Sequence, residues 1–248
     1  MYLLKKQEML NLYLVPAAKL KQKIESCLEE EIDVDVTQLE FCAILAECKL
    51  LRADFPSTDN RWQKFYSYFR VKDYSSQDRE KPIERYCMVP ALIALIFLSQ
   101  GTIDVKAKAI SEVFSGQRLL KPVKRGIRDV KNRQIDPSGG FRGIEQRSTL
   151  DEQTKKTTLT KEQLDCIIEV IVNVSLVMLP IYASDFPSGD KQQYMKMQVQ
   201  WYQKRHMIAE KLAKSFKTVP HGDIKLITVR NFIDKARQTD LFDVMAIR

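Results

Sequence analysis

The residue types that carry out most enzyme catalysis are sparse in this sequence. The chain has two histidines, His206 and His221, and neither has a cysteine or aspartate at the spacing of a known catalytic motif. It contains no phosphate-binding loop, no nucleophile elbow and no zinc-protease motif. The glycine-rich segment Gly139–Gly143 follows no apolar strand, so it does not resemble a phosphate cradle. We therefore predict a protein that is not an enzyme.

The residues best suited to bind a metal lie in an acidic stretch before Phe41. Calcium takes about six to eight oxygen ligands, and its helix–loop–helix sites also need a glycine at the sixth loop position for a sharp turn. In the loop 29–40 the sixth position is Val34. A β-branched residue is disfavoured at the positive φ that this position needs. We expect a solvated acidic turn and keep one residual calcium site as the alternative. Its ligands would be Glu29, Glu31, Asp33, Thr37 and Glu40.

Two parts of the chain share a helix–loop–helix plan. Apolar residues at helical spacing occupy residues 17–28 before the acidic stretch, and a second apolar stripe begins at Phe41. Near the C-terminus, apolar stripes in residues 208–216 and 229–236 flank the segment 220–231 in the same way. Few glycines and long runs of helix-forming residues also favour a helical protein.

A six-residue pattern marks the start of the second helix in each plan. It consists of an apolar residue, a small hydroxyl or thiol residue, two variable residues, an acid, amide or proline, and another apolar residue. The hydroxyl is placed to cap the helix that follows. Copies occur at residues 36–41, 86–91, 159–164 and 227–232, which indicates a repeated unit.

With these repeats, the chain resembles the four-EF-hand calcium-sensor superfamily, which includes neuronal calcium sensors, calcineurin B and calaxin. Residues 90–106 resemble the exit helix of the second hand and its Gly-Thr joint to the third. Residues 165–180 and 231–242 resemble the exit helix of the third hand and the closing helices. The resemblance implies that the first apolar residue of each repeat pairs with its counterpart in the partner hand through a short β-bridge.

The fourth loop departs from the family pattern. Lys225 stands where the resemblance implies a glycine, and the loop carries no carboxylate at a ligand position. We therefore expect no calcium there. The residues at the ligand positions are Pro220, Gly222, Ile224, Leu226, Thr228 and Asn231.

The middle of the chain is basic and lacks apolar periodicity. Most of the net charge of +8 lies between Arg118 and Arg147, where nine lysines and arginines accompany three acids. The segment is either a solvated connector between two lobes or a basic arm that becomes ordered on an acidic partner surface. Nucleic acid is a weaker alternative, because no aromatic ladder accompanies the charges. The arm residues are Arg118, Lys121, Lys124, Arg125, Arg128, Lys131 and Arg133.

Aromatic residues in three segments suit either a face packed in the core or an apolar groove for a partner helix. The groove candidates are Phe41, Trp62, Phe65, Tyr66, Phe69 and Trp201. The five cysteines lie within apolar helical patterns, which predicts buried free thiols. No apolar run is long and uninterrupted enough to span a membrane.

Together these features predict an all-α protein with two EF-hand-like helical lobes, minimal β-bridges and a long basic insertion. The lobes would comprise residues 1–114 and 159–248, with the insertion at 115–158. We expect an adaptor or structural subunit without cofactor that binds a protein partner through an amphipathic helix and an acidic surface. By resemblance to calaxin we expect a cytoplasmic setting in the ciliary axoneme, with a mitochondrial assembly as the alternative. A calcium sensor and a basic nucleic-acid-binding protein remain alternative functions.

Overall fold

The structure is a computed structural model that describes residues 15–27, 35–47, 50, 69–73, 83–115, 157–178, 191–243 and 247. These residues are mostly helical, which confirms the mainly helical part of the predicted fold class. In this described part of the chain, no helix combines the length and the apolar character that crossing a membrane requires.

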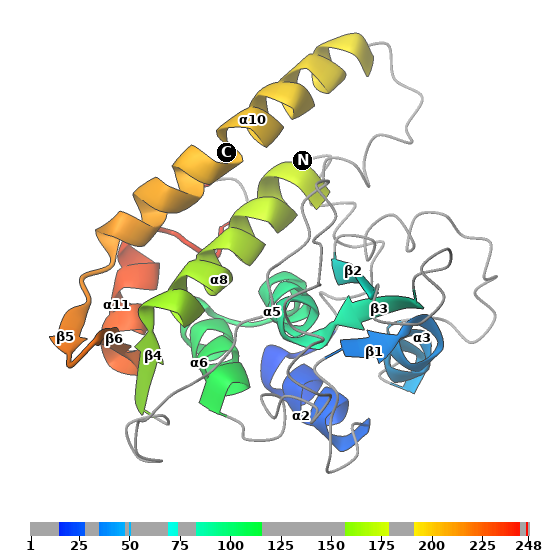
Figure 1. The fold of residues 1–248 in the computed structure, drawn as a ribbon, viewed down its shortest axis with the longest axis horizontal. Coiled ribbons are helices and arrows are strands. Elements are labelled where there is room, and N and C mark those ends of the chain that lie inside the picture. Colours follow the sequence, from blue (N-terminus) through cyan, green and yellow to red (C-terminus); the bar gives the residue numbers. More distant parts are fainter. Residues whose placement is uncertain are drawn as a thin grey trace.

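The core is arranged around α5 (Met88–Leu98), in which every residue is buried. Its sequence has no polar face, so the helix needs apolar neighbours on all sides. Pro90 lies in the first turn, where a backbone N–H has no partner inside the helix, so it does not interrupt the helix. The helices α6 (Ile103–Ser115) and α8 (Lys161–Asn173) pack against α5, which Figure 1 shows nearly end-on.

The predicted joint between the two central helices is confirmed. Thr102 directly precedes α6 and caps it, because its hydroxyl accepts a hydrogen bond from Val105 N at 3.4 Å. Lys106 reaches back from α6, and its Nζ donates to the carbonyl oxygen of Phe97 at 2.8 Å. This contact satisfies one of the carbonyl groups that the end of α5 leaves without a helical partner.

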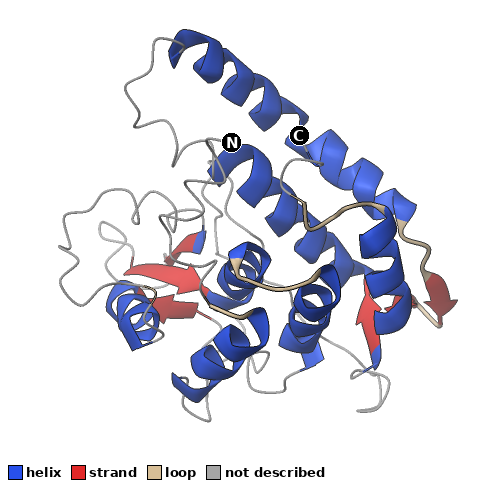
Figure 2. Cartoon of the chain, turned by 180° about the vertical axis from the view of Figure 1, so that it is seen from behind, coloured by secondary structure: helices blue, strands red, loops and turns tan. Residues whose placement is uncertain are grey.

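Two small antiparallel sheets lie at opposite sides of the molecule, with helices between them (Figure 1; Figure 2). The strand orders are β1-β3-β2 and β4-β6-β5. Each sheet therefore has a third strand in addition to the minimal β-bridge that we expected. The strands are β1 (Asp35–Thr37), β2 (Arg70–Asp73), β3 (Ile83–Cys87), β4 (Thr158–Thr160), β5 (Val219–His221) and β6 (Ile224–Thr228).

In each sheet, two paired strands are each followed directly by a helix. In the first sheet, α3 (Gln38–Glu47) follows β1 and α5 follows β3. In the second, α8 follows β4 and α11 (Val229–Gln238) follows β6. The four helix starts are the four copies of the repeat found in the sequence.

The C-terminal half is completed by α10 (Lys191–Ser215), which packs against α8 and its π-helical continuation η4 (Val174–Met178). The chain then turns through the β5–β6 hairpin, where Gly222 has φ +58°. Glycine adopts this positive φ without the strain that a Cβ would add. After the hairpin, α11 packs against α6.

Both halves of the chain contribute to one hydrophobic cluster. The helix α2 (Ala17–Cys27) packs against α5 and α6, and α5 packs against α8 across the predicted boundary between the lobes. The prediction that the thiols are buried is only partly confirmed. Cys87 and Cys166 are buried, whereas Cys42 is exposed on α3. The apolar residues around Cys42 are therefore no guide to its burial.

Candidate functional site

The two sheets bring the repeats together in pairs. Val36 of β1 lies opposite Tyr86 of β3, and Leu159 of β4 lies opposite Ile227 of β6. All four side chains are buried. These are the first apolar residues of the four repeats, so the pairing expected between repeats is found at both ends of the molecule.

The start of α8 shows what the recurring polar positions of the repeat do in this structure. The Thr160 hydroxyl accepts a hydrogen bond from Gln163 N at 3.3 Å, and the Gln163 side-chain oxygen accepts one from Thr160 N at 2.9 Å. This reciprocal arrangement is a capping box. Gln163 occupies the repeat position where a calcium loop would carry its bidentate carboxylate, and here its oxygen binds the backbone.

The start of α11 is built in a similar way. The Thr228 hydroxyl accepts a hydrogen bond from Asn231 N at 3.2 Å. The segment before it forms the β5–β6 hairpin, and β6 lies between two strands. Leu226 is thereby paired with Thr160 on one side and with Val219 on the other. The backbone at Leu226 therefore takes part in strand pairing on both sides.

The candidate ligands of the first loop are only partly described. Glu29, Glu31 and Asp33 lie outside the described residues. Thr37 ends β1 and directly precedes α3, and Glu40 is the third residue of that helix. These two positions correspond to Thr160 and Gln163 at the start of α8. Within the ranges that the structure describes, no three His, Cys, Asp or Glu side chains lie close enough to hold a metal ion.

The predicted aromatic groove is not assembled by the residues that can be placed. Phe69 is 1% exposed and belongs to the core cluster, so it offers no surface to a partner and its assignment to a groove is corrected. Trp201 is partly buried and packs against the same cluster. Trp62, Phe65 and Tyr66 lie outside the described residues, as does the side chain of Phe41. The basic arm lies outside them as well, since the described chain stops at residue 115 and resumes at 157.

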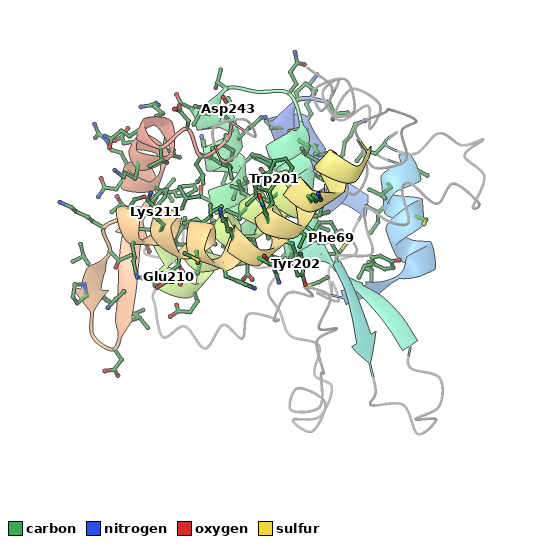
Figure 3. The ribbon with its side chains drawn as sticks, turned by 90° about the horizontal axis from the view of Figure 1, so that it is seen from above. Phe69, Trp201, Tyr202, Glu210, Lys211 and Asp243 are labelled. Carbon is green, nitrogen blue, oxygen red and sulfur yellow. The ribbon has the colours of Figure 1, made fainter. Side chains whose placement is uncertain are left out.

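A different surface, on the outer side of α10, carries exposed apolar residues. Val199 is 56% exposed, Tyr202 36% and Met207 70%. They are three of the five large apolar side chains that are exposed among the described residues. Lysines stand beside them along the helix, and Figure 3 shows α10 running across the face seen from above. We call this surface the α10 outer face, formed by Lys196, Val199, Tyr202, Lys204, Met207, Lys211 and Lys214.

The sequence contains a signal for this surface. Ile208, Leu212 and Phe216 follow one helical stripe and pack against the core. Val199 and Met207 do not continue that stripe, because their spacing places them on another side of the helix. Apolar residues off the buried stripe of an otherwise polar helix indicate a second contact surface.

Comparison with known proteins found no matching family model, no matching curated protein and no matching solved structure.

Proposed function

We propose that this protein is a non-catalytic adaptor built on an EF-hand-like scaffold that works without calcium. The observation that carries the proposal is the arrangement of the four repeats. Val36 pairs with Tyr86, Leu159 pairs with Ile227, and a helix leaves each of these four strands. This is the pairing that a four-hand scaffold requires.

The contacts at the loops support a role without metal. At the start of α8, the side chains of Gln163 and Thr160 each accept a hydrogen bond from the other's backbone N–H. At the start of α11, the Thr228 side chain accepts one from the backbone N–H of Asn231. These side chains lie at the positions that would otherwise serve calcium. With these side chains bonded to the backbone, the helix starts are satisfied without a metal, whereas a calcium sensor uses calcium binding to change the angle between its helices.

An ion pair between α6 and α11 supports the same conclusion. Arg237 donates through Nε and Nη2 to the two carboxylate oxygens of Asp104, at 2.5 and 2.7 Å. Asp234, one turn earlier in α11, accepts a further bond from the same guanidinium at 3.0 Å. Both side chains are about half exposed, so this two-point contact favours the observed orientation of one helix on the other by a modest amount.

Isothermal titration calorimetry with calcium tests the proposal on the full chain. We expect no calcium-dependent heat in the wild type or in Glu40→Ala, and the same melting temperature in calcium and in EGTA. Heat in the wild type that disappears in Glu40→Ala would instead establish the alternative, a calcium sensor with one site at residues 29–40. Partner identification by cross-linking mass spectrometry in EGTA then asks whether the adaptor has a constant protein partner.

A further inference from the structure

We propose that the α10 outer face is the docking site for an acidic amphipathic helix of a protein partner. The inference rests on the proposed adaptor function and adds to it the surface and the chemistry of the partner. It is carried by the exposure of the apolar side chains, by the charge of the helix and by the order in which the two alternate.

The apolar side chains point away from the body of the protein. The other side of α10 packs against α8 and η4, with Ala213 and Phe216 buried and Trp201 partly buried. Val199 and Met207 are more than half exposed on the outer side. Val199 and Met207 are therefore two separate apolar contact points on the outer side of one helix.

The Tyr202 ring is held in a defined position. The guanidinium of Arg205 lies 3.7 Å from the centre of the ring, which is a cation–π contact. Arg205 also donates a hydrogen bond to the backbone oxygen of Tyr202. An aromatic ring fixed before binding loses little conformational entropy when a partner packs on it.

The charge of the helix selects an acidic partner. Six lysines and arginines lie in α10, and Glu210 is its single acidic residue. Glu210 is already paired with Lys214, with Oε1 and Nζ 2.6 Å apart. Hydrogen bonding to Lys214 holds the pKa of the Glu210 carboxyl below its usual range. The outer face therefore presents a positive potential, which attracts an acidic partner.

The order of the residues favours a protein helix over a membrane. Lys204 precedes Met207 by three residues and Lys211 follows it by four, so lysines stand one turn on either side of this apolar side chain. Exposed Gln200 and Gln203 separate Val199 from Met207. A helix that lies in a membrane needs one continuous apolar stripe, whereas a partner helix can place leucines and glutamates to match such an alternating surface.

The same surface fits nucleic acid poorly. Binding to phosphates needs the lysines but makes no use of the exposed side chains of Val199 and Met207. Tyr202 is the one aromatic side chain of the α10 outer face, and bases stack on series of aromatic rings in single-strand binding sites. An acidic helix is the occupant that uses both the apolar and the charged residues.

Fluorescence anisotropy with the full-length chain tests this proposal. The probe is a labelled alanine-based helical peptide with leucines along one face and glutamates beside them. We expect Met207→Gln and Lys211→Glu each to weaken binding about tenfold, because each removes one half of the recognition. The matched controls are Val105→Gln and Lys108→Glu, which make the same changes at exposed positions of α6 and should bind as the wild type does.

Three results would overturn the proposal. They are absence of peptide binding, equal binding by wild type and both α10 variants, and loss of binding in the α6 controls to the same extent. Vesicles of phosphatidylcholine with phosphatidylserine, and duplex DNA, are titrated in parallel. If either binds through Met207 and Lys211 while the peptide does not, the partner class is wrong.

Calcium separates this proposal from the adaptor function on which it rests. Peptide binding that needs calcium would refute the calcium-independent adaptor and leave the α10 outer face in place. Calcium-independent behaviour in calorimetry combined with no peptide binding would refute the docking site alone.

Discussion

Replacing Gln163 tests whether the acid-or-amide position of the third repeat serves the fold. The variant Gln163→Met keeps the length of the side chain and its burial but removes the oxygen that accepts from Thr160 N at 2.9 Å. Its partner variant, Thr160→Val, removes the hydroxyl that accepts from Gln163 N at 3.3 Å. Neither change truncates a side chain, so no large cavity complicates the comparison.

The expected losses follow from burial and geometry. The N–H that loses its partner in Gln163→Met belongs to Thr160, and a buried backbone N–H left without a partner costs about 1 to 3 kcal/mol. Thr160 is partly exposed and water reaches part of this site, so we expect about 1.5 kcal/mol for Gln163→Met. The hydrogen bond to the Thr160 hydroxyl is longer, and losing a helix cap of this kind costs about 1 kcal/mol.

Urea denaturation followed by far-ultraviolet circular dichroism measures both losses. For a chain of this length, each kcal/mol corresponds to about 2 to 4 °C in melting temperature. The matched control is Glu169→Gln, an exposed position in the middle of the same helix. Substitutions at such positions usually change the free energy of unfolding by less than about 0.5 kcal/mol.

The variant Gln163→Glu tests separately whether this position supports the fold and whether it can bind calcium. Glutamate also completes a capping box, so stability should stay close to that of the wild type. It also restores the carboxylate of a calcium loop, yet we expect calcium to leave the melting temperature of this variant unchanged. The reasoning is refuted if Gln163→Met is as stable as the control, or if calcium stabilises Gln163→Glu but not the wild type.

Three further predictions concern ionisable groups. Burial lowers the pKa of Lys106 to about 8, so relative to Lys106→Met the wild type should gain about 3 kcal/mol of unfolding free energy as pH rises from about 8 to 10.4, measured by urea denaturation. A hydrogen bond from Arg237 lowers the pKa of Asp104, so the melting temperature difference between wild type and Asp104→Asn should shrink as pH falls below about 4. Iodoacetamide mass spectrometry should label Cys42 in the native protein but not Cys166, whose pKa burial raises to about 12.

Local sequence signals were sufficient for the helices, their joints and their caps. Thr160 and Thr228 could be placed at helix starts, because a hydroxyl before an apolar helical stripe caps the helix wherever that helix packs. The pairing of Leu159 with Ile227 needed one step more. It was implied only by the resemblance to paired EF-hands, in which the first apolar residue of one repeat pairs with its counterpart in the other; the local sequence alone does not choose the partner.

Features set by tertiary packing could not be read from local signals. The strand β2 pairs with β3 and extends that sheet, but its residues Arg70–Asp73 show no alternation that would predict a strand. Phe69 and Cys42 both belong to apolar segments, and only the packing of neighbouring elements places the first in the core and the second at the surface. Apolar periodicity identifies the side of a helix that is buried, without specifying which element covers it.

The location of the proposed docking site agrees with a lobe that does not open. A calcium sensor exposes its partner groove by moving its helices apart, so the site is accessible in one state and closed in the other. The α10 outer face lies on the side of α10 away from α8 and η4. It is exposed in this structure, in which Asp104 of α6 and Arg237 of α11 form an ion pair. A partner can therefore bind without any change in helix angle. Breaking this ion pair with Asp104→Asn should leave the affinity for the acidic peptide unchanged, whereas an affinity that rises in the variant would show that the binding surface lies inside the lobe.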